Sequence, residues 1–145
     1  MPFAKSFLSS EEQKQVVQAI AEAELFTSGE IRLHLESFCI GDPVKAARRV
    51  FKALHMHQTA ERNGVLIYMA TWSHKVAVIG DEGIHARLGQ VYWDELVQNM
   101  IKRLQSKQKA EALKECIVAC GRQLGHYFPR KDNDKNELSD SISFK

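Results

Sequence analysis

Two adjacent carboxylates, Asp81 and Glu82, stand between two glycines in the segment from Gly80 to Gly83. Carboxylate oxygens are the ligands that calcium and magnesium prefer, so this pair predicts a divalent-cation site. Two negative charges repel a phosphate, which would approach the pair only through such a cation. The pair also has a simpler interpretation, because an acidic residue that caps a helix N-terminus stabilises the helix by about 1 kcal/mol.

Several polar residues near this pair are further candidates for a site. Arg62 and Asn63 are candidates for contacting a phosphate or another ligand, and His85 belongs to the same loop region as the acids. Metal-assisted phosphate hydrolysis needs several carboxylates or histidines around the ion and a group that activates water. Asp94 and Glu95 follow on the next helical segment, but no spacing in the sequence brings them to the loop. The sequence therefore does not identify catalytic residues.

The acidic pair follows two segments that together predict a β-hairpin. Residues 65–70 are an unbroken apolar run, which is typical of a strand covered on both faces. Residues 71–74 are polar and residues 75–79 resume a β-branched pattern, so the second strand should run antiparallel to the first. The acids then lie where a strand ends and a helix begins, and open α/β sheets bind ligands beyond the carboxyl ends of strands.

A third strand is predicted at residues 30–37, where apolar residues alternate with Arg32, His34 and Glu36. The alternation predicts a strand that is covered on one face, with its polar side chains either lining a groove or facing solvent. The Asp-Pro pair at 42–43 then predicts the start of a helix. Strand, helix and central strand form a βαβ unit with parallel strands, so the fold class is α/β with a mixed sheet.

Periodic apolar patterns predict the other helices, so that about four to five helices pack on the sheet. The first helix follows Ser9 and Ser10, either of which can form a capping box with the residue three positions later. In the last helix Gly121 and Gly125 mark where it should weaken or end.

The chain of 145 residues is long enough to bury one sizeable core. Residues 1–128 are predicted to form a single domain, and residues 129–145 a polar, mobile C-terminal tail. In this tail residues 132–137 carry oxygen-bearing side chains at alternate positions, like the start of a calcium loop, but the glycine and the final glutamate of such a loop are missing. The segment predicts a weak cation binder at best.

The composition places few constraints on a partner. The 20 basic and 18 acidic side chains give a formal net charge of +2, which does not indicate binding to nucleic acid or to a membrane surface. No apolar segment approaches the roughly 20 residues of a membrane span, and the N-terminus lacks the apolar stretch of an export signal. We therefore expect a cytoplasmic protein without membrane insertion. The odd number of cysteines favours buried thiols over disulfides.

Residues 62–67 and 76–84, with an Asn-Gly entry into the apolar strand and a glycine loop after the hairpin, resemble the TPM domain family. The family is named for a thylakoid lumen protein, a photosystem II repair protein and a nematode receptor modulator. The resemblance covers roughly residues 8–128 and is that of a short, single-domain member of the bacterial type. It implies an α/β sandwich. It also implies acid phosphatase activity or divalent-cation binding for some members, and scaffold or repair roles for others.

The chain departs from the family pattern at two places. In relatives the loop commonly reads glycine, aromatic, glycine, leucine, glutamate, whereas residues 80–85 move the acids forward. Many relatives then carry a threonine-aspartate pair where this chain has Arg-Leu-Gly-Gln at 87–90, which removes one carboxylate that a phosphatase centre would use. Many relatives also carry an export signal and a membrane span or a glycine-rich tail, which argues against the lumenal and receptor roles here.

These observations predict a soluble TPM-like domain that binds calcium or magnesium at Asp81 and Glu82 without catalysing a reaction. One alternative is a metal-dependent acid phosphatase that uses the same loop. A second alternative is a protein-interaction module that presents its basic helix faces and its tail to a protein partner.

Overall fold

A computed structural model describes residues 3–106, 108–131 and 137–145 of the chain. These residues form five helices and four strands, and the hydrophobic periodicity predicted all of them except the short first helix and the last strand. The elements are α1 (Ala4–Phe7), α2 (Ser10–Glu24), β1 (Glu30–Glu36), α3 (Pro43–Ala53), β2 (Gly64–Ala70), β3 (Lys75–Gly80), α4 (Glu82–Gln105), α5 (Lys109–Tyr127) and β4 (Ser143–Phe144).

The four strands form one mixed sheet in the order β3-β2-β1-β4. β1 runs parallel to β2, and Glu30 lies opposite Gly64 at the start of the pair. β3 runs antiparallel to β2 and closes the predicted hairpin, with Val65 opposite Gly80. The predicted fold class, an α/β fold with a parallel βαβ unit and an antiparallel hairpin, is therefore confirmed.

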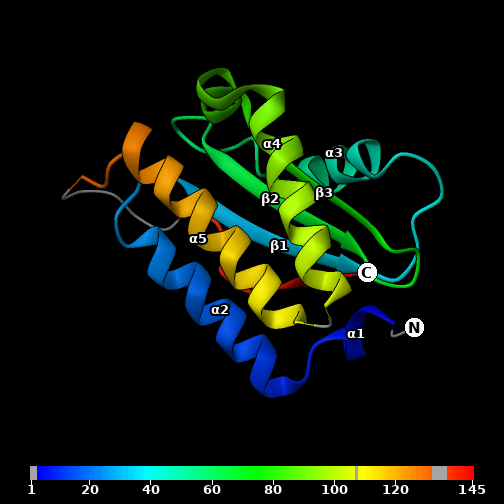
Figure 1. Cartoon of the computed structure of the whole chain (residues 1–145). Helices are drawn as coiled ribbons and strands as arrows, with labels where there is room; N and C mark the ends of the chain where they lie inside the picture. Colours follow the sequence, from blue (N-terminus) through cyan, green and yellow to red (C-terminus); the bar gives the residue numbers. More distant parts are fainter. Residues whose placement is uncertain (1–2, 107, 132–136) are drawn as a thin grey trace.

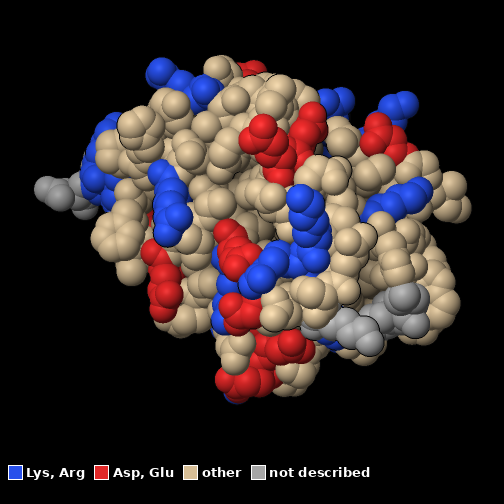
Figure 2. Space-filling model, viewed as in Figure 1, with Lys and Arg blue, Asp and Glu red and all other residues tan. Residues whose placement is uncertain are grey.

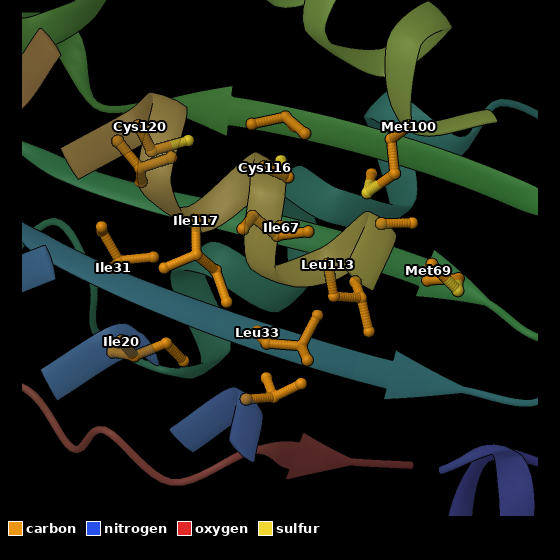
Figure 3. Packing of buried hydrophobic residues seen from close by; sticks show 14 of the residues in the cluster. Ile20, Ile31, Leu33, Ile67, Met69, Met100, Leu113, Cys116, Ile117 and Cys120 are labelled. Carbon is orange, nitrogen blue, oxygen red and sulfur yellow. The ribbon is translucent and has the colours of Figure 1, made fainter. Parts of the chain in front are cut away.

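Helices cover both faces of the sheet, so that the molecule is an α/β sandwich (Figure 1). Helices α2, α4 and α5 cover one face, and α3 packs on the other against Leu66, Tyr68 and Ala77. The larger core lies under the three helices and includes the side chains that Figure 3 labels: Ile20, Ile31, Leu33, Ile67, Met69, Met100, Leu113, Cys116, Ile117 and Cys120. β2 is buried along its whole length, as its unbroken apolar run predicts.

The local signals for helix starts are confirmed at two places. The Ser9 hydroxyl accepts a hydrogen bond from the Glu12 amide, and the Glu12 carboxylate accepts one from the Ser9 amide, which is the predicted capping box. Asp42 caps α3 through the Val44 amide at 2.9 Å. The three cysteines are free and buried, as expected from their number and their positions.

The prediction that β1 is covered on one face was wrong. Both faces of β1 are covered, and the side chains of His34 and Glu36 are buried. β4 also pairs with β1 on the side away from β2, so β1 is an inner strand. The polar alternation of β1 arises because these residues form hydrogen bonds inside the protein. The tail sequence did not indicate β4, because two residues are too few to show a periodic pattern.

Helix α5 continues through Gly121 and Gly125 to Tyr127, beyond the point where its glycines predicted an end. Gly121 lies where α5 crosses α2, and a Cβ atom at this position would come within 2.8 Å of the Ala23 Cβ atom. The glycine therefore permits close packing of the two helices, which outweighs its low helix propensity.

No described helix has both the length and the apolar character that crossing a bilayer requires. Acidic and basic side chains are interspersed on the face of the molecule that Figure 2 shows. This distribution agrees with the near balance of charges in the sequence.

The start of α4 is held against the loop that precedes β2, which gives a test of the packing. A Cβ atom at Gly83 would approach the carbonyl oxygens of Glu61 and Arg62 to 2.4 and 2.6 Å. Because backbone atoms cannot move aside cheaply, we expect Gly83→Ala to lower the free energy of unfolding by about 1–3 kcal/mol in urea titrations.

A matched alanine substitution in α5 controls for helix propensity. A Cβ atom at Gly125 meets only the Phe26 carbonyl at 3.5 Å, which is ordinary contact. Gly125→Ala should therefore leave the stability unchanged or raise it by about 0.5–1 kcal/mol. Equal effects of the two substitutions would contradict the packing of α4 on the 61–62 backbone.

Candidate metal centre

The sheet brings several polar segments together at one end, where strands begin or end. We call this end the polar edge, as distinct from the outer side of β3. The amino ends of the parallel strands β1 and β2 lie there, together with the carboxyl end of the antiparallel strand β3. The loop that precedes β2, the start of α4 and the end of α2 therefore meet near Glu30, Gly64 and Gly80. The predicted site residues all belong to this edge.

Arg62 and Asp81 form a bidentate ion pair at this edge. The Arg62 Nε and Nη2 atoms donate to the two carboxylate oxygens of Asp81 at 2.7 and 2.8 Å, and Nη1 donates to Glu82 at 3.2 Å. Hydrogen bonding to Asp81 raises the pKa of the Arg62 guanidinium. One Asp81 oxygen also accepts from the Glu82 amide at 2.8 Å and caps α4. Arg62 adopts a positive φ of 53°, a conformation that is uncommon for residues other than glycine.

The structure thus brings the candidate residues Arg62, Asp81 and Glu82 together, which no spacing in the sequence required, and it pairs them with each other. Both Asp81 oxygens accept hydrogen bonds from the guanidinium, so a cation at this position must displace Arg62. Of the other predicted loop residues, Gly83 donates its amide to the Arg62 carbonyl at 2.8 Å. The His85 Nδ1 atom accepts from the Trp93 indole at 2.9 Å, and the Trp93 ring packs over Gly80.

Asn63 lies beneath this loop, with 1% of its surface exposed. Its Nδ2 atom lies 3.2 Å from the Ser28 hydroxyl oxygen and 3.4 Å from a Glu61 carboxylate oxygen. Its Oδ1 atom is buried and accepts no hydrogen bond from the residues that the structure describes. Asn63 therefore ties the β1 entry to the loop before β2, and it contacts the polar groups of Ser28 and Glu61 rather than an open surface.

A second acidic cluster lies at the same edge, formed by Glu24, Glu30 and Asp140. One carboxylate oxygen from each lies within 4.8 Å of the others. Glu24 ends α2, Glu30 begins β1, and Asp140 precedes β4. Oxygens bound to one calcium ion at about 2.3–2.6 Å are at most about 5 Å apart, so this spacing fits a shared cation.

Burial perturbs the titration of this cluster. Glu24 and Glu30 are 6% and 2% exposed. Burial, with a hydrogen bond shared with Asp140, raises the pKa of Glu24 to about 10, and burial raises the pKa of Glu30 to about 7. Glu24 accepts from the Ile31 amide at 2.7 Å, and Glu30 accepts from the amides of Glu137 and Leu138. The cluster therefore retains protons at pH values where an exposed acid is ionised.

A basic side chain also lies close to the cluster. The Arg130 Nη1 atom donates to the main-chain carbonyl of Glu24 at 3.1 Å. Nearby, the Lys131 ammonium lies 3.3 Å from the Glu61 carboxylate. The predicted calcium-like segment at 132–137 falls largely on residues 132–136, which lie outside the described part of the chain. In the described part Glu137 contributes its amide, rather than its carboxylate, to Glu30.

Sequence reasoning missed the cluster because its members are far apart in the chain. The segment from Thr27 to Gly29 turns the chain between α2 and β1, which brings Glu24 beside Glu30. The available signal was Glu24 itself, a charged residue among the buried positions of an amphipathic helix. No sequence pattern predicts that Asp140 lies beside them.

The polar face of β1 forms a separate buried network. His34 lies between Ser143 and Glu36, with its ring nitrogens 2.8 and 3.1 Å from their side-chain oxygens. The Tyr68 hydroxyl donates to the second Glu36 oxygen. Burial lowers the pKa of His34, so the neutral imidazole is favoured. The network ties β4 to β1 and β2, and His34 and Glu36 do not line an open groove.

A mixed sheet with helices on both faces is the α/β sandwich that the sequence resemblance implies. A family model described as the TPM domain matches residues 4–123, and the chain belongs to this family. No curated protein sequence matches the chain. The family assignment confirms the predicted resemblance.

Two solved structures share the fold. The NMR structure of the BA42 protein from the psychrophilic bacterium Bizionia argentinensis is 37% identical, with a TM-score of 0.87, over 96% of this chain and 96% of that chain. The solution structure of the N-terminal domain of a protein from P. gingivalis is 16% identical, with a TM-score of 0.67, over 84% of this chain and 79% of that chain. The second likeness concerns the fold alone.

The two roles of Asp81 can be separated by substitution. Asparagine retains an oxygen that caps α4, whereas alanine removes both the cap and the acceptor for Arg62. We expect Asp81→Ala to be less stable than Asp81→Asn by about 1 kcal/mol in urea unfolding, and both to be less stable than the parent. An Asp81→Ala protein as stable as the parent would contradict the capping role.

Proposed function

We propose that this TPM-domain protein binds a divalent cation through Glu24, Glu30 and Asp140. The observation that carries the proposal is the convergence of three carboxylates within 4.8 Å of one another, two of them buried. The α2–β1 turn and the segment before β4 supply these groups from separate parts of the chain, so the fold itself holds the three side chains together.

The electrostatics of the cluster favour a cation. Ionised carboxylates this close repel one another, and burial weakens the screening by water. Burial is the larger cause of the raised pKa values of Glu24 and Glu30, and the negative charge of Glu30 adds to the shift at Glu24. Protons on these groups relieve the repulsion in the cation-free protein. A divalent ion supplies more positive charge at the same place and replaces these protons, so binding releases them.

The oxygen-only ligand set suits calcium or magnesium. Calcium accepts six to eight oxygens in flexible arrangements, and magnesium retains several waters while binding one or two carboxylates. Calcium can bind all three carboxylates, with water completing its shell, and magnesium can bind one or two of them and retain more water. Either ion therefore fits the ligand set.

Cation binding at Asp81 and Glu82 is a separate proposal for the same edge of the sheet. A cation there must break the two hydrogen bonds from Arg62 to Asp81 and leave the guanidinium without that partner. Phosphate hydrolysis at the Asp81 loop stays a prediction from the family resemblance.

An amide-resolved NMR titration of the chelator-treated protein with calcium and magnesium tests the proposal. We expect the amide shifts to concentrate at Glu24, Glu30 to Ile31 and Leu138 to Asp140. Glu30→Gln retains the shape and the acceptor for the two tail amides but removes the charge, and it should weaken binding by at least about tenfold. Shifts that centre elsewhere and survive this substitution would overturn the proposal.

Asp81→Asn is the matched control, because it removes a carboxylate from the other acidic group at the same edge. Binding at Glu24, Glu30 and Asp140 should be unchanged within about twofold, the limit of such titrations. If Asp81→Asn abolishes binding and Glu30→Gln does not, the cation belongs to the loop after the hairpin.

The raised pKa values also predict how stability depends on pH. A folded-state pKa above the unfolded value means that the folded protein binds more protons, so the contribution of the cluster is present below about pH 4.5 and is lost as the pH rises toward 7 and beyond. In chelator, Glu30→Gln should therefore be more stable than the parent at about pH 8, by about 1–3 kcal/mol. Saturating calcium should reverse this order, because it stabilises only the parent cluster.

Urea unfolding at about pH 5 and about pH 8, with chelator and with calcium, measures the effect. Glu82→Gln is the control, because it removes a largely exposed carboxylate that is paired with Arg62. It should leave the pH dependence of the parent unchanged. A stability difference between Glu30→Gln and the parent that does not change with pH would contradict the shared protonation of the cluster.

A further inference from the structure

The outer edge of β3 is open in the part of the chain that the structure describes. β3 is the terminal strand of the sheet and pairs only with β2. An open edge exposes backbone donors and acceptors that can bind another strand, and many proteins cover or charge such an edge. Here the edge lies in a groove between two helices.

The register shows which backbone groups face outward. The Asp81 amide donates to the Gly64 carbonyl at 2.8 Å, and Ile79 and Ala77 follow at alternate positions opposite Leu66 and Tyr68. In an antiparallel pair the amide and the carbonyl of one residue point to the same side. The amides and carbonyls of Val76, Val78 and Gly80 therefore point away from the sheet, in the spacing that an added strand requires.

A groove of about 460 Å³ runs along this edge. α3 forms one wall and the first half of α4 forms the other, with residues 78–80 of β3 at the base. On the α4 side the wall contains the Trp93 and His85 side chains. On the α3 side it contains Phe51 with two basic residues, Arg48 and Lys52. The α4 wall therefore presents aromatic rings, whereas the α3 wall also presents basic side chains.

Arg48 and Lys52 are one helical turn apart, so both extend from α3 on the same side. Neither forms an ion pair with any residue in the described ranges. At the end of the groove Asp81 and Glu82 are neutralised in part by Arg62. The available charge in the groove is thus positive and lies on the α3 side.

We propose that the β3 edge binds an extended peptide segment of a protein partner, in which acidic side chains alternate with apolar ones. Side chains that lie opposite one another on neighbouring strands point to the same face. Peptide residues opposite Val78 and Gly80 meet the α4 wall around Trp93, which favours apolar groups. Their neighbours point toward Arg48 and Lys52, which favour carboxylates.

The inference does not depend on cation binding. The groove contains none of Glu24, Glu30 and Asp140, and the peptide is recognised by backbone hydrogen bonds and by the α3 charges. Peptide binding at the β3 edge would make this chain a protein-interaction module, which is the second alternative that the sequence left open. Peptide binding and cation binding can therefore succeed or fail separately.

A synthetic peptide of alternating glutamate and valine, seven residues long by design, is the probe. We expect its addition to shift the amides of Val76, Val78 and Gly80 in NMR spectra of the full chain, with a dissociation constant in the micromolar to submillimolar range. Alternating lysine and valine is the charge-reversed control and should bind at least about tenfold more weakly.

Two N-methylated forms of the peptide test the backbone hydrogen bonds. One carries methyl groups on the glutamate amides and the other on the valine amides. Only one of these sets faces β3 in an added strand, so one form should bind like the parent peptide and the other should lose binding. Equal binding of the two forms would exclude strand addition.

Two pairs of substitutions in α3 test the charge. Arg48→Glu with Lys52→Glu should weaken the peptide at least about tenfold. Lys45→Glu with Arg49→Glu makes the same change of charge on the same helix at positions outside the groove, and it should change binding by less than about twofold.

Absence of shifts at Val76, Val78 and Gly80 at millimolar peptide would overturn the proposal, as would equal effects of the two α3 pairs. A concentration-dependent dimer with these same amides protected would assign the edge to a second copy of the chain and would also overturn it. Sedimentation at several protein concentrations distinguishes this outcome from peptide binding.

Discussion

The burial of β2 on both faces and along both edges is the constraint on which the rest of the structure depends. A strand without access to water must pair its backbone groups on each side, so β1 and β3 are both required. The parallel crossover to β1 and the hairpin to β3 then place two strand beginnings and one strand end at the same edge. The polar edge and the open side of β3 both follow from this arrangement.

The two acidic groups at the edge balance their charge in different ways. Asp81 is paired with a guanidinium and caps a helix, so its charge has partners within the protein. Glu24 and Glu30 have main-chain amides as partners, but they also lie beside each other and beside Asp140. Amide hydrogen bonds favour ionised carboxylates, whereas burial and mutual repulsion oppose ionisation. In this cluster burial is the larger effect, since both pKa values are raised.

The hairpin, the βαβ unit and the helix caps could be predicted because each is encoded by neighbouring residues. The apolar run at 65–70 predicts a buried strand, and the loop acids could be recognised from their position between glycines. The ion pair between Arg62 and Asp81 could not be predicted, because it depends on the positive φ of Arg62 and on α4 packing against the 61–62 backbone. The Glu24 cluster needs β4 to place Asp140, and β4 has too few residues to show a pattern.

The C-terminal segment links the proposed cation site to the stability of the sheet. Its amides bind Glu30 at one end, and β4 pairs with β1 and contacts His34 at the other end. A cation bound by Glu24, Glu30 and Asp140 would connect α2, β1 and this segment at a single point. Because these groups are brought together only in the folded chain, the free energy of cation binding would add to the free energy of folding. The bound cation would then hold β4 in place beside β1.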